Sequence, residues 1–90
     1  ENEKLLALKV YPNPTKSAFT ISYYLGGADN VSYSITDLTG RVIEEQNSSM
    51  QIAGKHEVNV VAEQKGMSPG IYYFKLMTSN TMQTHRIVVQ

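Results

Sequence analysis

Few side chains of this 90-residue sequence could carry out chemistry. Histidine occurs only at His56 and His85, and a metal site would need both rings close to carboxylates such as Glu44 or Glu57. The spacing of these residues matches no local ligand motif. Cysteine is absent, which excludes a thiol nucleophile, a cysteine zinc site and disulfides. The sequence therefore predicts no metal and no other cofactor.

Carboxylates and hydroxyls give no better catalytic candidate. Hydrolytic acid and base pairs lie ~5–10 Å apart in one cleft, whereas adjacent residues of a strand point to opposite faces. Glu44 and Glu45 are therefore expected on the solvated surface. Ser48, Ser49 and Ser68 lack the strand–turn–helix context of a nucleophile elbow. We predict that the chain is not an enzyme.

Six tyrosines offer an alternative function. Tyr24 and Tyr73 each follow another tyrosine, so one ring of each pair should face the core and the other the solvent. Two outward rings could form an aromatic platform of the kind that binds sugars or single-stranded nucleic acid. The alternative hypothesis is an accessory carbohydrate-binding β-sandwich of a secreted enzyme. Against it, tyrosine is also a good strand former.

Charge and hydropathy exclude several partners. Eight Lys and Arg residues balance eight Asp and Glu residues, so the chain has no electrostatic attraction for a polyanion and no nucleic-acid partner is expected. The longest apolar runs have four residues, far below the ~20 needed to cross a bilayer. We predict no transmembrane segment.

Period-two alternation dominates the sequence and predicts strands. In residues 18–25 Phe19, Ile21, Tyr23 and Leu25 share one face. Runs rich in Gly, Asp and Pro separate the strands as turns. The expected strands are residues 4–11, 18–25, 31–37, 41–48, 54–61, 70–78 and 81–89. Seven short strands predict an all-β fold, an immunoglobulin-like seven-stranded antiparallel β-sandwich, as a single domain over residues 1–90.

Two prolines interrupt the first strand. Residues that precede proline are held extended, so Tyr11 and Asn13 are expected to be extended, and Pro12 and Pro14 have no backbone N–H. The segment cannot lie in a central strand. It is predicted to be either a sheet edge or a corner where the chain passes from one sheet to the other.

Four stretches occur in a characteristic order: VYPNPT (residues 10–15), ITDLTGRVI (35–43), MSPGIYYFKLMT (67–78) and HRIVVQ (85–90). In this order and spacing, from about Leu8 onward, the chain resembles the type A C-terminal sorting domain of Bacteroidetes proteins exported by the type IX (Por) secretion system. Carried over by position, the recognition residues implied by the resemblance are Tyr11, Pro12, Asn13, Pro14, Asp37, Gly40, Arg41, Gly70, Tyr72, His85, Arg86, Ile87, Val88 and Val89.

The resemblance implies a non-catalytic sorting and anchoring domain, the C-terminal module of a larger secreted protein. The implied partners are the outer-membrane translocon, a sortase-like protease and an upstream cargo domain. The implied route leads through the periplasm to the cell surface or the outside. Family members commonly end in a lysine-flanked strand, whereas here His85 and Arg86 precede the last apolar residues and Gln90 follows them.

The last strand is expected to be an edge whose unpaired backbone groups accept a receptor strand by β-augmentation. On this reading Arg86 and His85 supply polar specificity. The competing interpretation is a solvated strand face whose charges discourage aggregation.

Overall fold

Alternating apolar side chains build seven strands in the computed structural model, which describes residues 6–90. The strands are β1 (Leu6–Tyr11), β2 (Ala18–Leu25), β3 (Asp29–Asp37), β4 (Val42–Gln51), β5 (Gly54–Val61), β6 (Gly70–Met77) and β7 (Met82–Val89). The predicted number of strands is confirmed. β3 begins two residues earlier and β4 ends three residues later than the sequence indicated, and residues 4 and 5 lie outside the described part.

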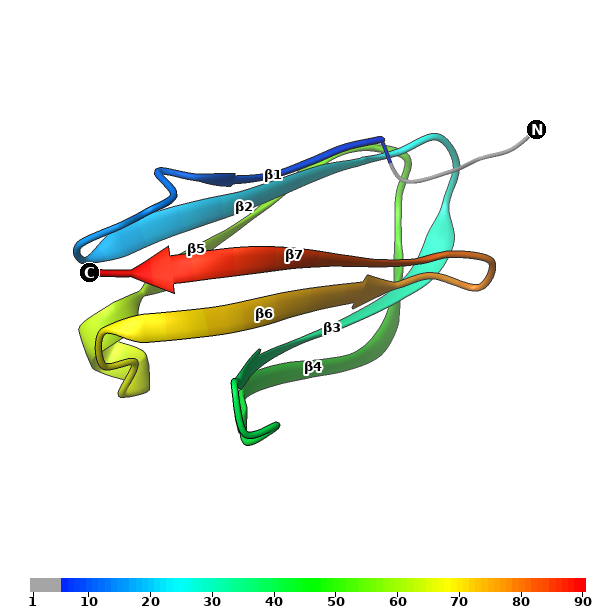
Figure 1. The fold of residues 1–90 in the computed structure, drawn as a ribbon. Coiled ribbons are helices and arrows are strands. Elements are labelled where there is room, and N and C mark those ends of the chain that lie inside the picture. Colours follow the sequence, from blue (N-terminus) through cyan, green and yellow to red (C-terminus); the bar gives the residue numbers. More distant parts are fainter. Residues whose placement is uncertain (1–5) are drawn as a thin grey trace.

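The strands form two antiparallel sheets that pack face to face as an immunoglobulin-like sandwich (Figure 1). One sheet has the order β1-β2-β5 and the other the order β4-β3-β6-β7. β1 and β7 are thus edge strands on the same side of the sandwich. They run in the same direction along it (Figure 1), which places the end of β1 beside the end of β7.

The core lies between the two sheets and consists of the alternate residues that the sequence predicted. The inward side chains of β2 and β6 are all buried, and Ile21, Phe74 and Leu76 have no exposed surface. Tyr23 also lies in this layer, where its hydroxyl donates a hydrogen bond to Gln51 Oε1 at 2.5 Å. Burial of the ring raises the pKa of Tyr23.

β4 is at the edge of the four-stranded sheet and is mostly polar, although its Ile43 packs against the core. Ile35 on β3 pairs with Glu44 on β4, so Glu44 points to the same side as the core but lies half-buried at the open margin. A 3₁₀ turn, η1 (Ala62–Lys65), follows β5 and was not predicted. Lys65 on η1 contacts Glu44 Oε1 at 2.6 Å, which ties the two sheets together at this margin.

Candidate functional site

The four sequence stretches reach the same end of the sandwich, where β6 separates the turn after β3 from β7 and the proline segment (Figure 1). On β3 and β6 Asp37 pairs with Tyr72, and at the start of β6 Gly70 pairs with Val89. Thr15 forms an isolated parallel bridge with Val89. We call this end the motif pole and define it as residues 12–15, 37–41, 67–70 and 88–90.

The proline segment is the corner between the sheets, one of the two alternatives that the sequence left open. Before it, Tyr11 pairs with Thr20 in the first sheet, and after it Thr15 bridges β7 in the second. Residues 12–14 form a bend, and the bonds before Pro12 and Pro14 are both cis. The expected extended conformation is confirmed for Tyr11, which ends β1, but it is wrong for Asn13, which lies in the bend that carries the chain to the other sheet.

Asn13 acts as a substitute for a strand residue beside β7. Its Nδ2 donates to the carbonyl oxygen of Arg86 at 2.8 Å, and its Oδ1 accepts from the N–H of Val88 at 2.9 Å. Next to it, the Thr15 N–H donates to the Val88 carbonyl at 2.9 Å, and the Gln90 N–H donates to the Thr15 carbonyl at 2.7 Å. The corner thus satisfies the outer backbone groups of β7 from the carbonyl of Arg86 to the N–H of Gln90.

This pairing corrects one prediction. The C-terminal residues of β7 were expected to offer free backbone groups to a receptor strand, but the chain's own corner already occupies that part of the edge. This contact was not predictable from local sequence because Asn13 and Val88 are 75 residues apart.

The turn after β3 is organised by one carboxylate. Asp37 Oδ1 accepts hydrogen bonds from the Thr39 hydroxyl at 2.7 Å, the Thr39 N–H at 2.9 Å and the Arg41 N–H at 2.9 Å. Asp37 Oδ2 accepts from Arg41 Nε at 3.1 Å. These bonds, foremost the one from the Thr39 hydroxyl, lower the pKa of Asp37 to about 2. Gly40 closes the turn at a φ of +91°, which favours glycine.

Leu38 lies at the tip of this turn and is 66% exposed. The sequence analysis did not single it out, because a leucine inside a strand-and-turn pattern reads as core. The signal that could have identified it is its position between Asp37 and Gly40, the outer residues of a type I turn.

Three of the recognition residues belong to the core. Tyr72, Ile87 and Val89 are each at most 4% exposed, and the Tyr72 hydroxyl donates to the carbonyl oxygen of Ser68 at 2.6 Å. Their side chains support the pole from inside and are not available to a partner. The other expected recognition residues are exposed or half-buried: Tyr11, Pro12, Asn13, Pro14, Asp37, Gly40, Arg41, Gly70, His85, Arg86 and Val88.

The residues considered for catalysis or sugar binding are not assembled into a site. Tyr24 is on the outer face of the three-stranded sheet and Tyr73 on the outer face of the other, so the expected joint platform is wrong. Glu44 and Glu45 face opposite sides of β4. Residues 6–90 contain no group of three or more His, Cys, Asp or Glu side chains that could hold a metal.

The two histidines are on different sheets and have different contacts. His56 stacks on Tyr23 with ring centroids 5.3 Å apart, and its Nε2 lies 2.7 Å from the carbonyl oxygen of Ile52. His85 Nδ1 lies 2.9 Å from the carbonyl oxygen of Arg86. Neither contact indicates a role as a general acid or base.

A comparison with protein families explains the convergence of the four stretches. The family model for a secretion system C-terminal sorting domain matches residues 9–90. The chain belongs to this family. It is a C-terminal sorting signal for type IX secretion, which implies export, contact with the type IX machinery and a cargo in the same chain. A search of curated proteins found no match.

The sorting domain contains no helix within residues 6–90 that is long and apolar enough to cross a membrane. Its family role needs a surface that another protein can recognise and no catalytic group. The motif pole contains exposed residues from all four stretches.

Proposed function

We propose that the sorting domain is a non-catalytic tag whose motif pole is read by the outer-membrane translocon of type IX secretion. The domain, residues 1–90, is the C-terminal module of a larger secreted protein. Its cargo lies upstream, passes through the periplasm, and is delivered to the cell surface or the outside. A sortase-like protease is the second partner.

The observation that carries this proposal is that residues 12–15, 37–41 and 88–90, from distant parts of the sequence, lie at the same end of the sandwich. Each segment has its own restraint: Asn13 is bonded to β7, and Asp37 is bonded within its turn. A signal that must work on unrelated cargoes has to present the same shape every time. Rigid, hydrogen-bonded segments on one end of a sandwich satisfy this need.

The test uses the full 90-residue chain fused to a periplasmic reporter in a host with type IX secretion. Leu38→Asp places a charge on the exposed tip of the pole, and we expect at least a tenfold drop in exported reporter. Ile52→Asp is the matched control, because Ile52 is 74% exposed and follows β4 at the opposite end of the sandwich. We expect this variant to be exported like the unmodified fusion.

The possible outcomes separate the parts of the proposal. Retention of the unmodified fusion in the periplasm would contradict the sorting role itself. Equal export of Leu38→Asp and Ile52→Asp would remove the motif pole as the recognised surface. Thermal unfolding of both purified domains checks that each variant remains folded, since neither side chain is in the core.

A further inference from the structure

Within residues 6–90, the outer edge of β7 is paired over only half of its length. Backbone groups of alternate residues face opposite neighbours in a strand, and the bonds of Asn13 and Thr15 show that Arg86, Val88 and Gln90 face outward. The same alternation turns Met82 and Thr84 outward. Among the described residues, nothing pairs with the N–H groups of residues 82, 84 and 86 or the carbonyls of 82 and 84.

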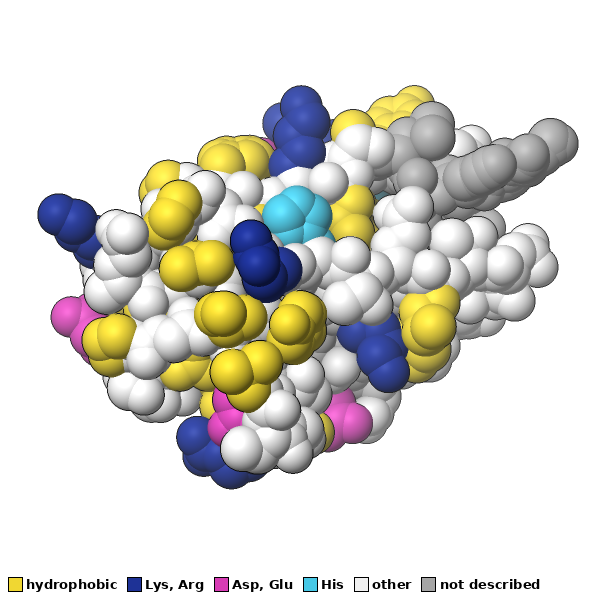
Figure 2. All heavy atoms as spheres, viewed as in Figure 1, with side chains coloured by type: hydrophobic (Ala, Val, Ile, Leu, Met, Phe, Trp, Pro, Cys, Tyr) yellow, Lys and Arg dark blue, Asp and Glu magenta, His cyan; other side chains and the backbone are white. Residues whose placement is uncertain are grey.

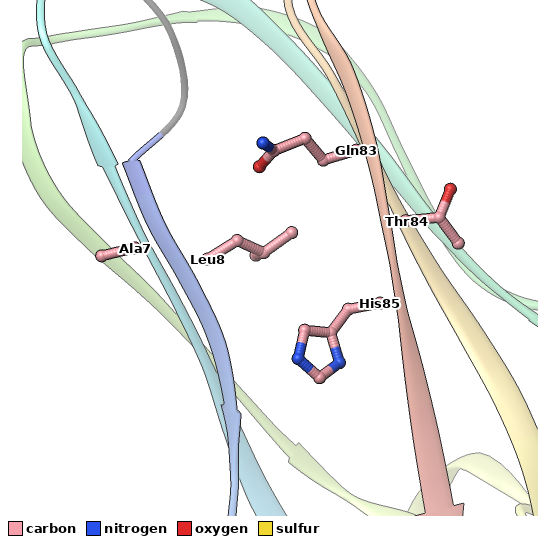
Figure 3. Close-up of a pocket in the computed structure, with 5 residues that line it drawn as sticks. All are labelled: Ala7, Leu8, Gln83, Thr84 and His85. Atoms are coloured by element: carbon pink, nitrogen blue, oxygen red, sulfur yellow. The ribbon is translucent and has the colours of Figure 1, made fainter.

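A groove of about 430 Å³ runs beside this open half. It is lined by Ala7, Leu8, Gln83, Thr84 and His85. In Figure 3 the side chains of Leu8, Gln83 and His85 lie in the space between β1 and β7, whereas Ala7 and Thr84 point away from it. The groove exists because β1 belongs to the other sheet and does not pair with β7.

The groove contains both apolar and hydrogen-bonding surface. Leu8 supplies a partly buried apolar wall that packs against the core. Opposite it lie the Gln83 amide, for which no hydrogen bond to a described residue is found, and the His85 ring. A single apolar side chain from an added strand would contact Leu8, and polar groups beside it would reach Gln83 and His85.

The charges around the open edge are basic, although the whole chain is neutral. Arg86 is on the outer face of β7, and Lys75 is directly opposite Thr84 on β6. Neither cation forms an ion pair with a described residue. Figure 2 shows basic side chains and a histidine ring over the middle of this face and acidic side chains at its margin.

The nearest acidic groups on this sheet are engaged or distant. Asp29 is bound to the Ser79 hydroxyl at 2.8 Å. Glu45 is on β4, three strands away from β7 in the same row of cross-strand neighbours, because Glu45 pairs with Ser34 and Ser34 pairs with Lys75. An acidic partner is therefore the electrostatic complement of the open edge.

We propose that the open half of β7, Met82 to Arg86, binds an extended acidic segment of a partner protein by β-augmentation. The segment is about five residues long, ~17 Å at ~3.4 Å per residue, because Asn13 ends the free edge beyond Arg86. Backbone bonds to residues 82, 84 and 86 supply most of the affinity. One apolar side chain enters the groove over Leu8, and a carboxylate lies beside Arg86.

Charge argues against a second copy of the chain as the occupant. Antiparallel pairing of two β7 edges around Thr84 would bring Arg86 and Lys75 of both copies into one small area. Like charges across a strand pair are destabilising, and basic edge residues are a common means of preventing such self-association. The same charges attract an acidic strand.

The test measures the binding of a fluorescein-labelled nine-residue peptide that alternates valine and glutamate to the 90-residue chain. Its control peptide alternates valine and lysine. The key variant is Thr84→Pro, which removes an outward N–H and is tolerated on an edge strand. Thr84→Val is the matched control, because it keeps the N–H. Fluorescence anisotropy gives the affinity, and amide exchange by NMR locates the contact.

We expect the glutamate peptide to bind at least tenfold more tightly than the lysine peptide and to slow exchange of the residue 82, 84 and 86 amides. Thr84→Pro should weaken binding at least tenfold, and Thr84→Val should leave it unchanged. Equal binding by Thr84→Pro, protection on β4 or β5 instead, or a dimer in sedimentation that excludes the peptide would each overturn the proposal. Because the assay needs no secretion, its failure would leave the role of the motif pole unaffected.

Discussion

At the residue scale, two short polar side chains form hydrogen bonds that backbone groups usually form. The Asn13 side chain pairs with β7 as a residue of a neighbouring strand would. The Asp37 carboxylate accepts hydrogen bonds from backbone N–H groups of its own turn. Asp37 was predictable as part of a turn, because Asp and Gly at its outer positions are local signals. The contacts of Asn13 were not predictable, because they depend on which strands the fold brings together.

Asp37 predicts a specific acid sensitivity. Hydrogen bonds from Thr39 and Arg41 lower its pKa from 3.8 to about 2 in the folded chain. A lowered pKa means that ionised Asp37 stabilises the fold above pH ~4, and that this contribution is lost as the pH falls through 2. Asp37→Asn keeps an acceptor but has no charge to titrate, so its melting temperature should fall less between pH 4 and 2.

The measurement is a series of thermal unfolding curves for both proteins from pH 5 to pH 2, together with an NMR titration of the Asp37 carboxyl carbon. Other carboxylates titrate in both proteins, so only the difference between the two curves reports on Asp37. Parallel curves, or a carboxyl that titrates near pH 4, would show that the turn does not hold the charge as described.

At the element scale, β7 has two halves with different neighbours. Its C-terminal half is closed by the corner at residues 12–15, and no described residue pairs with its N-terminal half along the groove. A strand at residues 81–89 was correctly predicted, and in it Ile87 and Val89 face inward. The alternation could not predict the division, because a period-two pattern describes the faces of a strand and carries no information about its edges.

The boundaries of β4 likewise could not be predicted from local sequence alone. Asn47, Ser48 and Ser49 are weak strand formers, and the prediction ended the strand at residue 48. In the structure Ser49 pairs with Val31 and Gln51 with Asp29. Pairing with the start of β3 therefore overrides local propensity, and both β3 and β4 are longer than the sequence pattern indicated.

The closed half of β7 gives a test of the corner. Asn13→Ala removes both side-chain hydrogen bonds to β7, and we expect a loss of about 1 kcal/mol in the free energy of unfolding because the groups left behind are near solvent. The Val88 amide should lose its protection against hydrogen exchange. Asn80→Ala is the control, since no hydrogen bond of the Asn80 side chain to a described residue is found.

Urea unfolding measures the stabilities, and NMR hydrogen exchange measures the amides of residues 86–90. We expect Asn80→Ala to stay within about 0.5 kcal/mol of the unmodified chain. If Val88 stays protected in Asn13→Ala, the Thr15 bridge alone holds the corner and Asn13 has no part in closing the edge.

At the scale of the whole molecule, the sequence predicted the architecture but not the site. Alternation and turn residues were enough to predict seven strands and a sandwich, because the period-two pattern of each strand indicates which of its faces is buried. The meeting of residues 12–15, 37–41 and 88–90 at one end depends on strand order, and strand order is set by contacts between distant segments. The order of the motifs in the sequence therefore indicated the family, whereas only the fold shows that they share one surface.

This difference leads to a prediction about what the secretion machinery recognises. If it reads a folded surface, a change outside all four stretches should abolish export when it unfolds the domain. Ile21 is such a residue: it is on β2 and has no exposed surface. Ile21→Asp buries an unpaired carboxylate, which a small core cannot accommodate, while every motif residue remains chemically intact.

We expect the reporter fused to the Ile21→Asp domain to remain in the periplasm. Tyr24→Asp, on the same strand but 45% exposed, should be exported normally. Circular dichroism of the purified domains establishes which variant is folded, and immunoblots of periplasm and medium measure export. Efficient export of an unfolded Ile21→Asp domain would show that the machinery reads the stretches as linear peptides, and the convergence at the motif pole would then be a consequence of folding without a role in sorting.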